Sequence, residues 1–119
     1  MTEPDAPPGR VLVDTASTLV RILTLAPGEI GPWHWHTHVT DQTLCLEGRL
    51  WLDLESPDDT FELVAGTARV VPVPPHQVHR VRNPAAASAA YLLIQHGGPY
   101  DFNQVTEAEL RGRWKRPGA

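Results

Sequence analysis

The chain has 119 residues and a mass of 13.1 kDa, which is enough for one domain and leaves no room for a second. Its net charge of -4 argues against a nucleic-acid partner, and its 12 prolines and nine glycines argue against a helical bundle. The apolar runs are too short to span a bilayer, so we expect no membrane association. Cys45 is the single cysteine, which excludes an internal disulfide. With no apolar leader at the N-terminus, we expect a cytoplasmic protein.

Residues 1–9 are rich in proline and predict a flexible N-terminal arm, and residues 10–119 are expected to form a single domain. Short apolar or alternating runs, separated by turn residues, predict strands in that domain. These runs cover residues 11–13, 18–25, 33–38, 43–46, 49–54, 60–64, 68–73, 78–82 and 89–94. Glu47-Gly48 predicts a hairpin turn between the fourth and fifth runs. Thr106 and Glu109 form a capping-box pattern that predicts one short C-terminal helix.

About nine short strands in a chain of this length predict an all-β sandwich, jelly roll or small barrel. Two sheets or a closed barrel are expected, because a single open sheet leaves its edge strands unpaired. Trp33 and Trp35 are predicted to fill the space between sheets or a subunit interface, and Cys45 to be a small buried hydrophobic residue. Arg80 and Arg82 are predicted to point away from His79 and to be solvated or paired.

Histidines at positions 34, 36 and 38 share one face of a predicted strand. Side chains two residues apart on a strand point the same way, so two of these imidazoles can converge on one metal ion. The alternative is a polar strand face of solvated histidines, and the spacing alone leaves both interpretations open. The other histidines, His76 and His96, are predicted to lie on the surface, and His38 at the exposed end of its strand.

The stretch from Gly28 to Gly48 resembles the first sequence motif of the cupins, G-x5-H-x-H-x3-4-E-x6-G. His34 and His36 occupy the two histidine positions, and Asp41 stands where the family has glutamate.

A second stretch resembles the other cupin motif, G-x5-P-x-G-x2-H-x3-N. Pro74, His79 and Asn83 match its proline, histidine and asparagine. His76 stands where the motif has its second glycine, and Gly66 lies two residues too far upstream for the first.

The resemblance to a small single-domain cupin implies a double-stranded β-helix, a jelly-roll barrel. It also implies a metal site made of His34, His36, Asp41 and His79, with one divalent transition metal per chain: Fe, Ni, Mn, Cu or Zn. Aspartate is one methylene shorter than glutamate, so Asp41 either binds the metal directly or binds a ligand water.

A rival register would use His36, His38 and Gln42 as the ligands, and it departs from the spacing of the family motif.

The resemblance further implies a metal-dependent enzyme of the dioxygenase type that acts on a small organic molecule. Two alternatives are a non-redox isomerase, lyase or cyclase on the same fold, and a small-molecule binding or sensing module without catalysis. A homodimer is expected, because two-fold dimers are the commonest oligomers.

Overall fold

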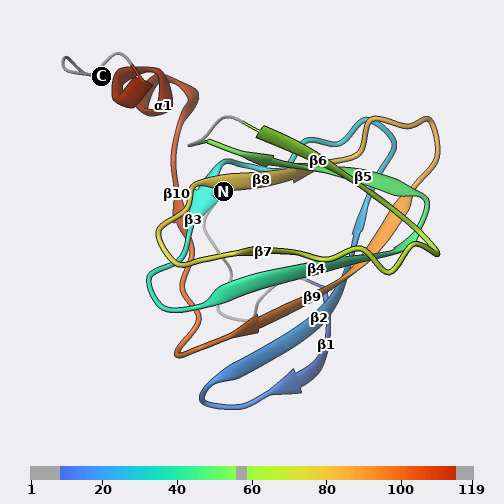
Figure 1. Cartoon of the computed structure of the whole chain (residues 1–119), viewed down its shortest axis with the longest axis horizontal. Coiled ribbons are helices and arrows are strands. Elements are labelled where there is room, and N and C mark those ends of the chain that lie inside the picture. The colour runs from blue at the N-terminus through green and yellow to red at the C-terminus, as the bar shows by residue number, and fades with distance from the viewer. Residues whose placement is uncertain (1–8, 56–58, 115–119) are drawn as a thin grey trace.

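The computed structural model describes residues 9–55 and 59–114, and these form two antiparallel sheets stacked in two layers (Figure 1). The strands are β1 (Arg10–Asp14), β2 (Thr18–Leu25), β3 (His34–Trp35), β4 (Thr40–Glu47), β5 (Arg49–Leu54), β6 (Asp59–Val64), β7 (Val71–Val73), β8 (His79–Arg82), β9 (Ala89–His96) and β10 (Asn103–Gln104). The helix α1 (Glu107–Trp114) follows β10. The all-β prediction is therefore confirmed. Of the predicted N-terminal arm, all but Gly9 lies outside the described residues.

The two sheets interleave strands that are far apart in the sequence. Sheet A has the order β1-β2-β9-β4-β7 and sheet B the order β10-β3-β8-β5-β6. In sheet A, β9 pairs with all eight residues of β2 on one side and with β4 on the other. No helix in the described part of the chain is long and apolar enough to cross a membrane.

The predicted hairpin at Glu47-Gly48 is wrong, because β4 and β5 belong to different sheets. The register of β4 against β9 shifts between Cys45 and Glu47, and Gly48 then adopts a left-handed φ of 73°. A Cβ at Gly48 would lie 2.8 Å from the carbonyl oxygen of Ser88. Only glycine allows this close approach, so Gly48 is the corner at which the chain crosses from one sheet to the other.

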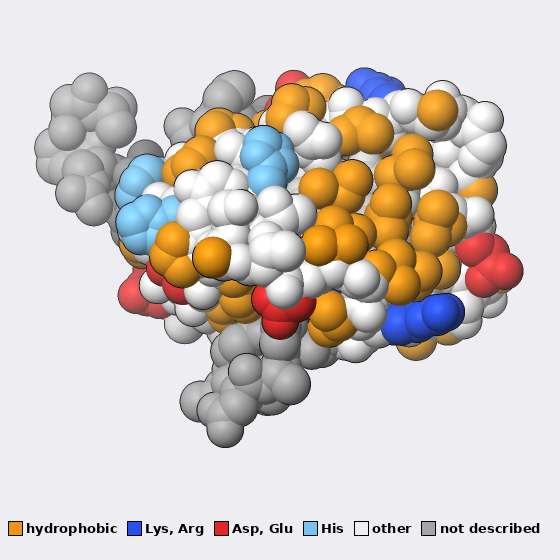
Figure 2. All heavy atoms as spheres, turned by 90° about the horizontal axis from the view of Figure 1, so that it is seen from below, with side chains coloured by type: hydrophobic (Ala, Val, Ile, Leu, Met, Phe, Trp, Pro, Cys, Tyr) orange, Lys and Arg blue, Asp and Glu red, His pale blue; other side chains and the backbone are white. Residues whose placement is uncertain are grey.

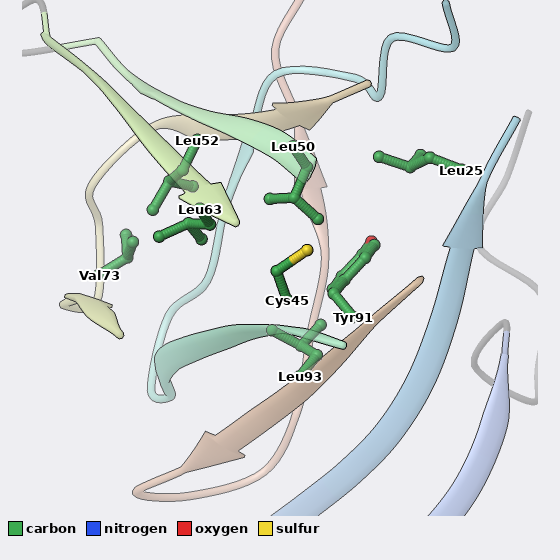
Figure 3. Close-up of a cluster of buried hydrophobic side chains, with 8 residues drawn as sticks. All are labelled: Leu25, Cys45, Leu50, Leu52, Leu63, Val73, Tyr91 and Leu93. Atoms are coloured by element: carbon green, nitrogen blue, oxygen red, sulfur yellow. The ribbon is translucent and has the colours of Figure 1, made fainter. Parts of the chain in front are cut away.

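The hydrophobic core lies between the two sheets (Figure 3). Strand residues alternate between the core and the outer faces, so the inward residues of β4, β5 and β9 are buried. The core side chains are Leu25, Cys45, Leu50, Leu52, Leu63, Val73, Tyr91 and Leu93. Cys45 is thus a core residue, as predicted, and burial raises the pKa of its thiol.

A second cluster lies under the C-terminal helix. Trp33 and Trp35 pack there against Val78, Val105 and Leu110, rather than between the two sheets. The predicted capping box is confirmed: the backbone amide of Thr106 donates to Oε1 of Glu109 at 2.9 Å, and the Glu109 amide donates to the Thr106 hydroxyl at 3.1 Å.

Three predicted strands are shorter in the structure, and the one predicted over residues 78–82 differs by a single residue. The histidine-rich strand ends at Trp35, because the backbone oxygen of His36 accepts from His76 and the amide of Thr37 donates to the Asp101 side chain. The strand predicted over residues 68–73 begins at Val71, since Ala68 has a left-handed φ of 56° that no strand residue adopts. The two-residue strand β10 was not predicted, because it is too short to show an alternating pattern.

Candidate metal centre

The four residues implied as metal ligands come together between the two sheets. His34 on β3 lies directly opposite His79 on β8 in sheet B, and Asp41 comes from β4 in sheet A. His36 follows β3, where the chain crosses to the other sheet. One potential ligand atom from each of the four residues lies within 4.8 Å of the other three. Because His36, Asp41 and His79 are buried, this group could hold a metal ion shielded from bulk solvent.

Each of the three imidazoles donates a hydrogen bond from Nδ1 to a backbone carbonyl oxygen. A carbonyl oxygen only accepts, so each Nδ1 carries a hydrogen and each Nε2 faces the shared centre, where a metal ion would take the place of any hydrogen on it. The Nδ1 atoms of His34, His79 and His36 lie 2.9, 2.8 and 2.6 Å from the backbone oxygens of Pro32, Gln77 and Asp101. This is the arrangement found when histidine binds a metal through Nε2.

The carboxylate of Asp41 reaches the imidazoles although it lacks one methylene of glutamate. Its Oδ2 lies 2.8 Å from Nε2 of His79 and 3.2 Å from Nε2 of His36. Two ligand atoms bound at about 2.1 Å to one ion are about 3 Å apart when adjacent, so these separations suit a shared ion. The other carboxylate oxygen, Oδ1, accepts from the side-chain amide of Gln95 at 2.9 Å.

The protonation states of His34 and Asp41 favour cation binding. Burial, followed by the neighbouring charge of His79, lowers the pKa of His34 to about 3. Burial opposes ionisation of Asp41, but hydrogen bonds from His36 and His79 outweigh it and hold its pKa well below the usual value. Burial also lowers the pKa of His36, and the hydrogen bond to Asp41 reverses that effect and raises it. At neutral pH the group therefore holds a neutral His34 and an ionised Asp41.

A cavity of about 320 Å³ lies beside the cluster and extends between the sheets. The ring of Phe102 stacks on His34 with 4.6 Å between centroids, and the ring of Tyr100 lies 5.6 Å from that of His36. The rest of the wall is mostly apolar and includes Leu23, Leu25, Val81, Tyr91 and Leu93. Such a space suits a small organic molecule placed against the four candidate ligands.

Several residues that form hydrogen bonds with the cluster were not predicted from the sequence. Arg21 donates from Nη2 to Oε1 of Gln95 at 2.7 Å, and Gln95 donates to Asp41. The backbone oxygen of Asp101 holds His36, and its carboxylate accepts from the amide and hydroxyl of Thr37. The sequence does mark Arg21 and Gln95 as unusual, because each is a polar residue among apolar residues on the inward face of its strand.

The remaining candidates lie elsewhere. His38, His76 and His96 are exposed, as predicted. Gln42 alternates with the buried Asp41 and Thr43 on β4 and so points to the outer face of the sheet. The rival register through His36, His38 and Gln42 therefore does not converge on one point.

The second motif is recognisable in the backbone. Counting from Pro74, its two glycine positions are occupied by Ala68 and His76, which are the non-glycine residues with left-handed φ, 56° and 72°, among those described. The motif asparagine, Asn83, is buried and donates to the carbonyl oxygens of Leu25, Ala26 and Ala87 at 2.8–3.2 Å. These hydrogen bonds connect the end of β2 with the turn before β9.

Residues 21–95 match the family model described as Cupin domain, and the chain therefore belongs to the cupin family. No curated protein matches the sequence.

Solved structures share the fold at low sequence identity. An uncharacterized protein with a double-stranded β-helix domain from Klebsiella pneumoniae has a TM-score of 0.72 and 19% identity, and the match covers 90% of each chain. A protein from Thermus thermophilus has a TM-score of 0.66 and 22% identity, with 76% of this chain and 82% of that chain covered. An oxalate oxidase has a TM-score of 0.65 and 18% identity, with 75% of this chain and 46% of that chain covered. At these identities the likeness shows the double-stranded β-helix fold alone.

Proposed function

We propose that this cupin is a metal-dependent enzyme of the oxygenase type that acts on a small organic molecule. One observation carries the proposal: three imidazole nitrogens and a carboxylate converge at the wall of a largely apolar cavity of about 320 Å³. That an oxalate oxidase shares the fold supports testing oxygen chemistry first.

The donor set suits one divalent ion of Fe, Ni, Mn, Cu or Zn per chain. His34, His36 and His79 would bind it through Nε2 and Asp41 through Oδ2, with Gln95 holding the other oxygen of that carboxylate. Such an ion, when bound, can act as a Lewis acid, orient a substrate or activate dioxygen. The chain itself supplies an apolar wall that limits water, and Phe102 and Tyr100 beside His34 and His36.

Metal content is the first test of the proposal. The protein would be expressed with each metal supplied in turn, and bound metal measured by mass spectrometry. We expect about one ion per chain in the native protein and its loss in His34→Ala and His79→Ala. His38→Ala is the matched control, because His38 belongs to the same stretch but is exposed. Absence of metal from the native protein under every supplement would contradict the proposal.

Oxygen consumption is the second test. The loaded protein would be given a panel of diketones, flavonoids, thiols and catechols, and we expect metal-dependent O₂ uptake with at least one of them. Full turnover with Zn(II) under anaerobic conditions would instead assign a non-redox reaction. A ligand that raises thermal stability and is recovered unchanged would assign a binding module.

A further inference from the structure

The cavity has the metal-ligand cluster and Arg21 at one end, and mostly apolar side chains line the rest of its wall. In the register of sheet A, Asp41 pairs with Gln95, the next inward residue of β9 is Leu93, and the one after that is Tyr91. On β2, Arg21 lies opposite Leu93 and Leu23 lies opposite Tyr91. The cavity wall therefore changes from the metal-ligand cluster, through Arg21, to aliphatic and aromatic side chains.

Arg21 places a positive charge at the end of the cavity that holds the metal-ligand cluster. The residue is only 2% exposed, yet it lines the cavity. Gln95 accepts from its Nη2 at 2.7 Å, and its Cζ lies 5.0 Å from the centre of the Tyr100 ring. Because Gln95 also donates to Asp41, the guanidinium is two hydrogen bonds away from the candidate metal ligands. These contacts hold the planar guanidinium in a fixed position.

An acidic residue on the cavity wall lies away from this end. Glu29 follows the end of β2, and its Oε1 accepts from the backbone amide of Ala26 at 2.8 Å. From Arg21 to Leu25, the last residue of β2, the strand extends by about 13 Å. Of these two charged residues, Arg21 favours a negatively charged group of a ligand and Glu29 disfavours it, and a bound metal ion would offset the charge of Asp41 at the Arg21 end.

The size of the cavity limits the ligand. A volume of about 320 Å³ corresponds to about ten water-sized groups at roughly 30 Å³ each, close to the lower limit for small-molecule pockets.

We propose that the cavity takes a small organic carboxylate of about ten non-hydrogen atoms, with its charged group on Arg21 beside the metal cluster and its apolar body against Leu23, Val81 and Leu93. A guanidinium donates charge-assisted hydrogen bonds to a carboxylate, and these are stronger than its hydrogen bonds to a neutral amide. This inference rests on the proposed function, since it names the class of molecule that would reach the metal.

The test compares acids with neutral molecules of the same shape. The protein would be loaded with Zn(II), which is redox-inert, so no oxygen chemistry consumes the ligand. Calorimetry would then compare phenylacetate with phenylacetamide, and hexanoate with hexanamide. We expect each acid to bind at least about tenfold more tightly than its amide. Equal affinity of acid and amide in the native protein would overturn the proposal.

Variants of Arg21 separate its contribution from that of the metal. We expect Arg21→Gln to lose most of the preference for the acid while its zinc content stays at the native level. Arg21→Lys keeps the charge but not the planar geometry, and should weaken acid binding less. Arg10→Gln is the control, because Arg10 is an exposed arginine on the neighbouring strand β1. An undiminished preference in Arg21→Gln would show that the metal alone selects the acid, and would overturn the role of Arg21.

Failure of the proposed function can be distinguished from failure of this inference. Zinc content is measured before any titration, so a protein without metal is recognised at that step. The comparison of acid with amide would then be repeated on the metal-free Asp41→Asn variant, in which Arg21 keeps its charge and the ionised carboxylate beside it is removed. A tenfold preference there supports the inference without the metal, and no preference overturns it.

Discussion

Two residues of the second motif hold a backbone conformation that their side chains disfavour. Ala68 and His76 have left-handed φ values of 56° and 72° at the positions where the cupin motif has glycine. For a residue with a Cβ this conformation costs about 1–2 kcal/mol. The fold therefore tolerates the loss of both motif glycines, at a cost in stability that a reverse substitution should recover.

We expect Ala68→Gly to raise the free energy of unfolding by about 1 kcal/mol, because the relief of strain exceeds the added flexibility of the unfolded chain. Ala68 is exposed, so the substitution removes no core contact. Urea unfolding would measure the change. Ala86→Gly is the control, since Ala86 is exposed and is not among the residues with positive φ, and it should lose about 0.5–1 kcal/mol instead. Equal effects of the two substitutions would contradict the assignment of strain to Ala68.

At the same scale, the candidate ligands were predictable and their supports were not. His34, His36, Asp41 and His79 stand at fixed spacings that a motif records. The strand pattern marks Arg21 and Gln95 as inward polar residues, but their partners, like that of Asp101, lie 54 to 74 residues away in the sequence, and no local pattern identifies them. The reach of Asp41 also depends on its place in β4, which only the packing of the two sheets determines.

At the scale of elements, the local pattern located most strands but did not assign them to sheets. The alternation at residues 33–38 continues past Trp35, where the strand ends because the backbone of His36 and Thr37 bonds to loop residues instead. Glu47-Gly48 has the composition of a hairpin turn. In the structure, the register shift after Cys45 and the close contact of Gly48 with Ser88 instead let the chain pass from sheet A to sheet B at this point.

On sheet B, one buried carboxylate on β5 forms hydrogen bonds with side chains of both neighbouring strands, β8 and β6. Asp53 on β5 accepts from Nε of Arg80 at 2.9 Å and of Arg82 at 2.6 Å on β8, and from the Thr60 hydroxyl on β6 at 2.7 Å. The two guanidiniums also lie over the Trp33 and Trp51 rings, at 4.3 and 4.5 Å. The predicted pairing of Arg80 and Arg82 is thus confirmed.

We expect Asp53→Asn to lower the free energy of unfolding by about 1.5–3 kcal/mol at neutral pH, because it weakens hydrogen bonds between charged groups. Burial raises the pKa of Asp53, but the hydrogen bonds from Arg82, Arg80 and Thr60 outweigh it and lower the pKa. A lowered folded-state pKa stabilises the protein above the unfolded value of about 3.9, and this stabilisation is lost as the pH falls below it.

Urea unfolding between pH 7 and pH 2.5 would measure this prediction. The difference between native protein and Asp53→Asn should be largest near pH 7 and shrink below about pH 4. Asp14→Asn is the control, because Asp14 is exposed on β1 and should change stability by less than about 0.5 kcal/mol. A difference that stays constant with pH would rule out the ionised carboxylate as its cause.

At the scale of the whole molecule, sheet A presents an apolar outer face. Figure 2, seen from the side of this sheet, shows hydrophobic side chains gathered into a broad area. Apart from Glu47 at the end of β4 and His96 at the end of β9, the outward residues of the three central strands carry no ionisable group, although a sheet face in contact with water ordinarily carries charged residues. They include Val20, Ile22 and Thr24 on β2, Ala90, Leu92 and Ile94 on β9, and Thr40, Gln42 and Leu44 on β4.

We propose that a second copy of the chain covers this face, as the expected homodimer would. A two-fold interface brings the same patch of both copies together. A largely uncharged face can therefore pack against itself without a partner surface of opposite charge. Light scattering should give twice the chain mass of 13.1 kDa, and Leu92→Glu should shift it toward the monomer. Val64→Glu, at an exposed position on sheet B, should leave the mass unchanged. A monomeric native protein would contradict the proposal.

The metal centre would also couple the two layers of the fold. Asp41 belongs to sheet A, whereas His34 and His79 belong to sheet B, so a single ion would join the sheets at one end of the cavity. An ion that binds only the folded chain stabilises it by about 2.7 kcal/mol at 100 times its Kd, which raises the Tm by about 10 °C. We expect calorimetry to show this rise in the native protein and its reversal by a chelator. His79→Ala should melt at the same temperature with and without metal, whereas His38→Ala should behave as the native protein does. A rise that persists in His79→Ala would mean that the ion binds elsewhere and that the sheets are held together by the hydrophobic core alone.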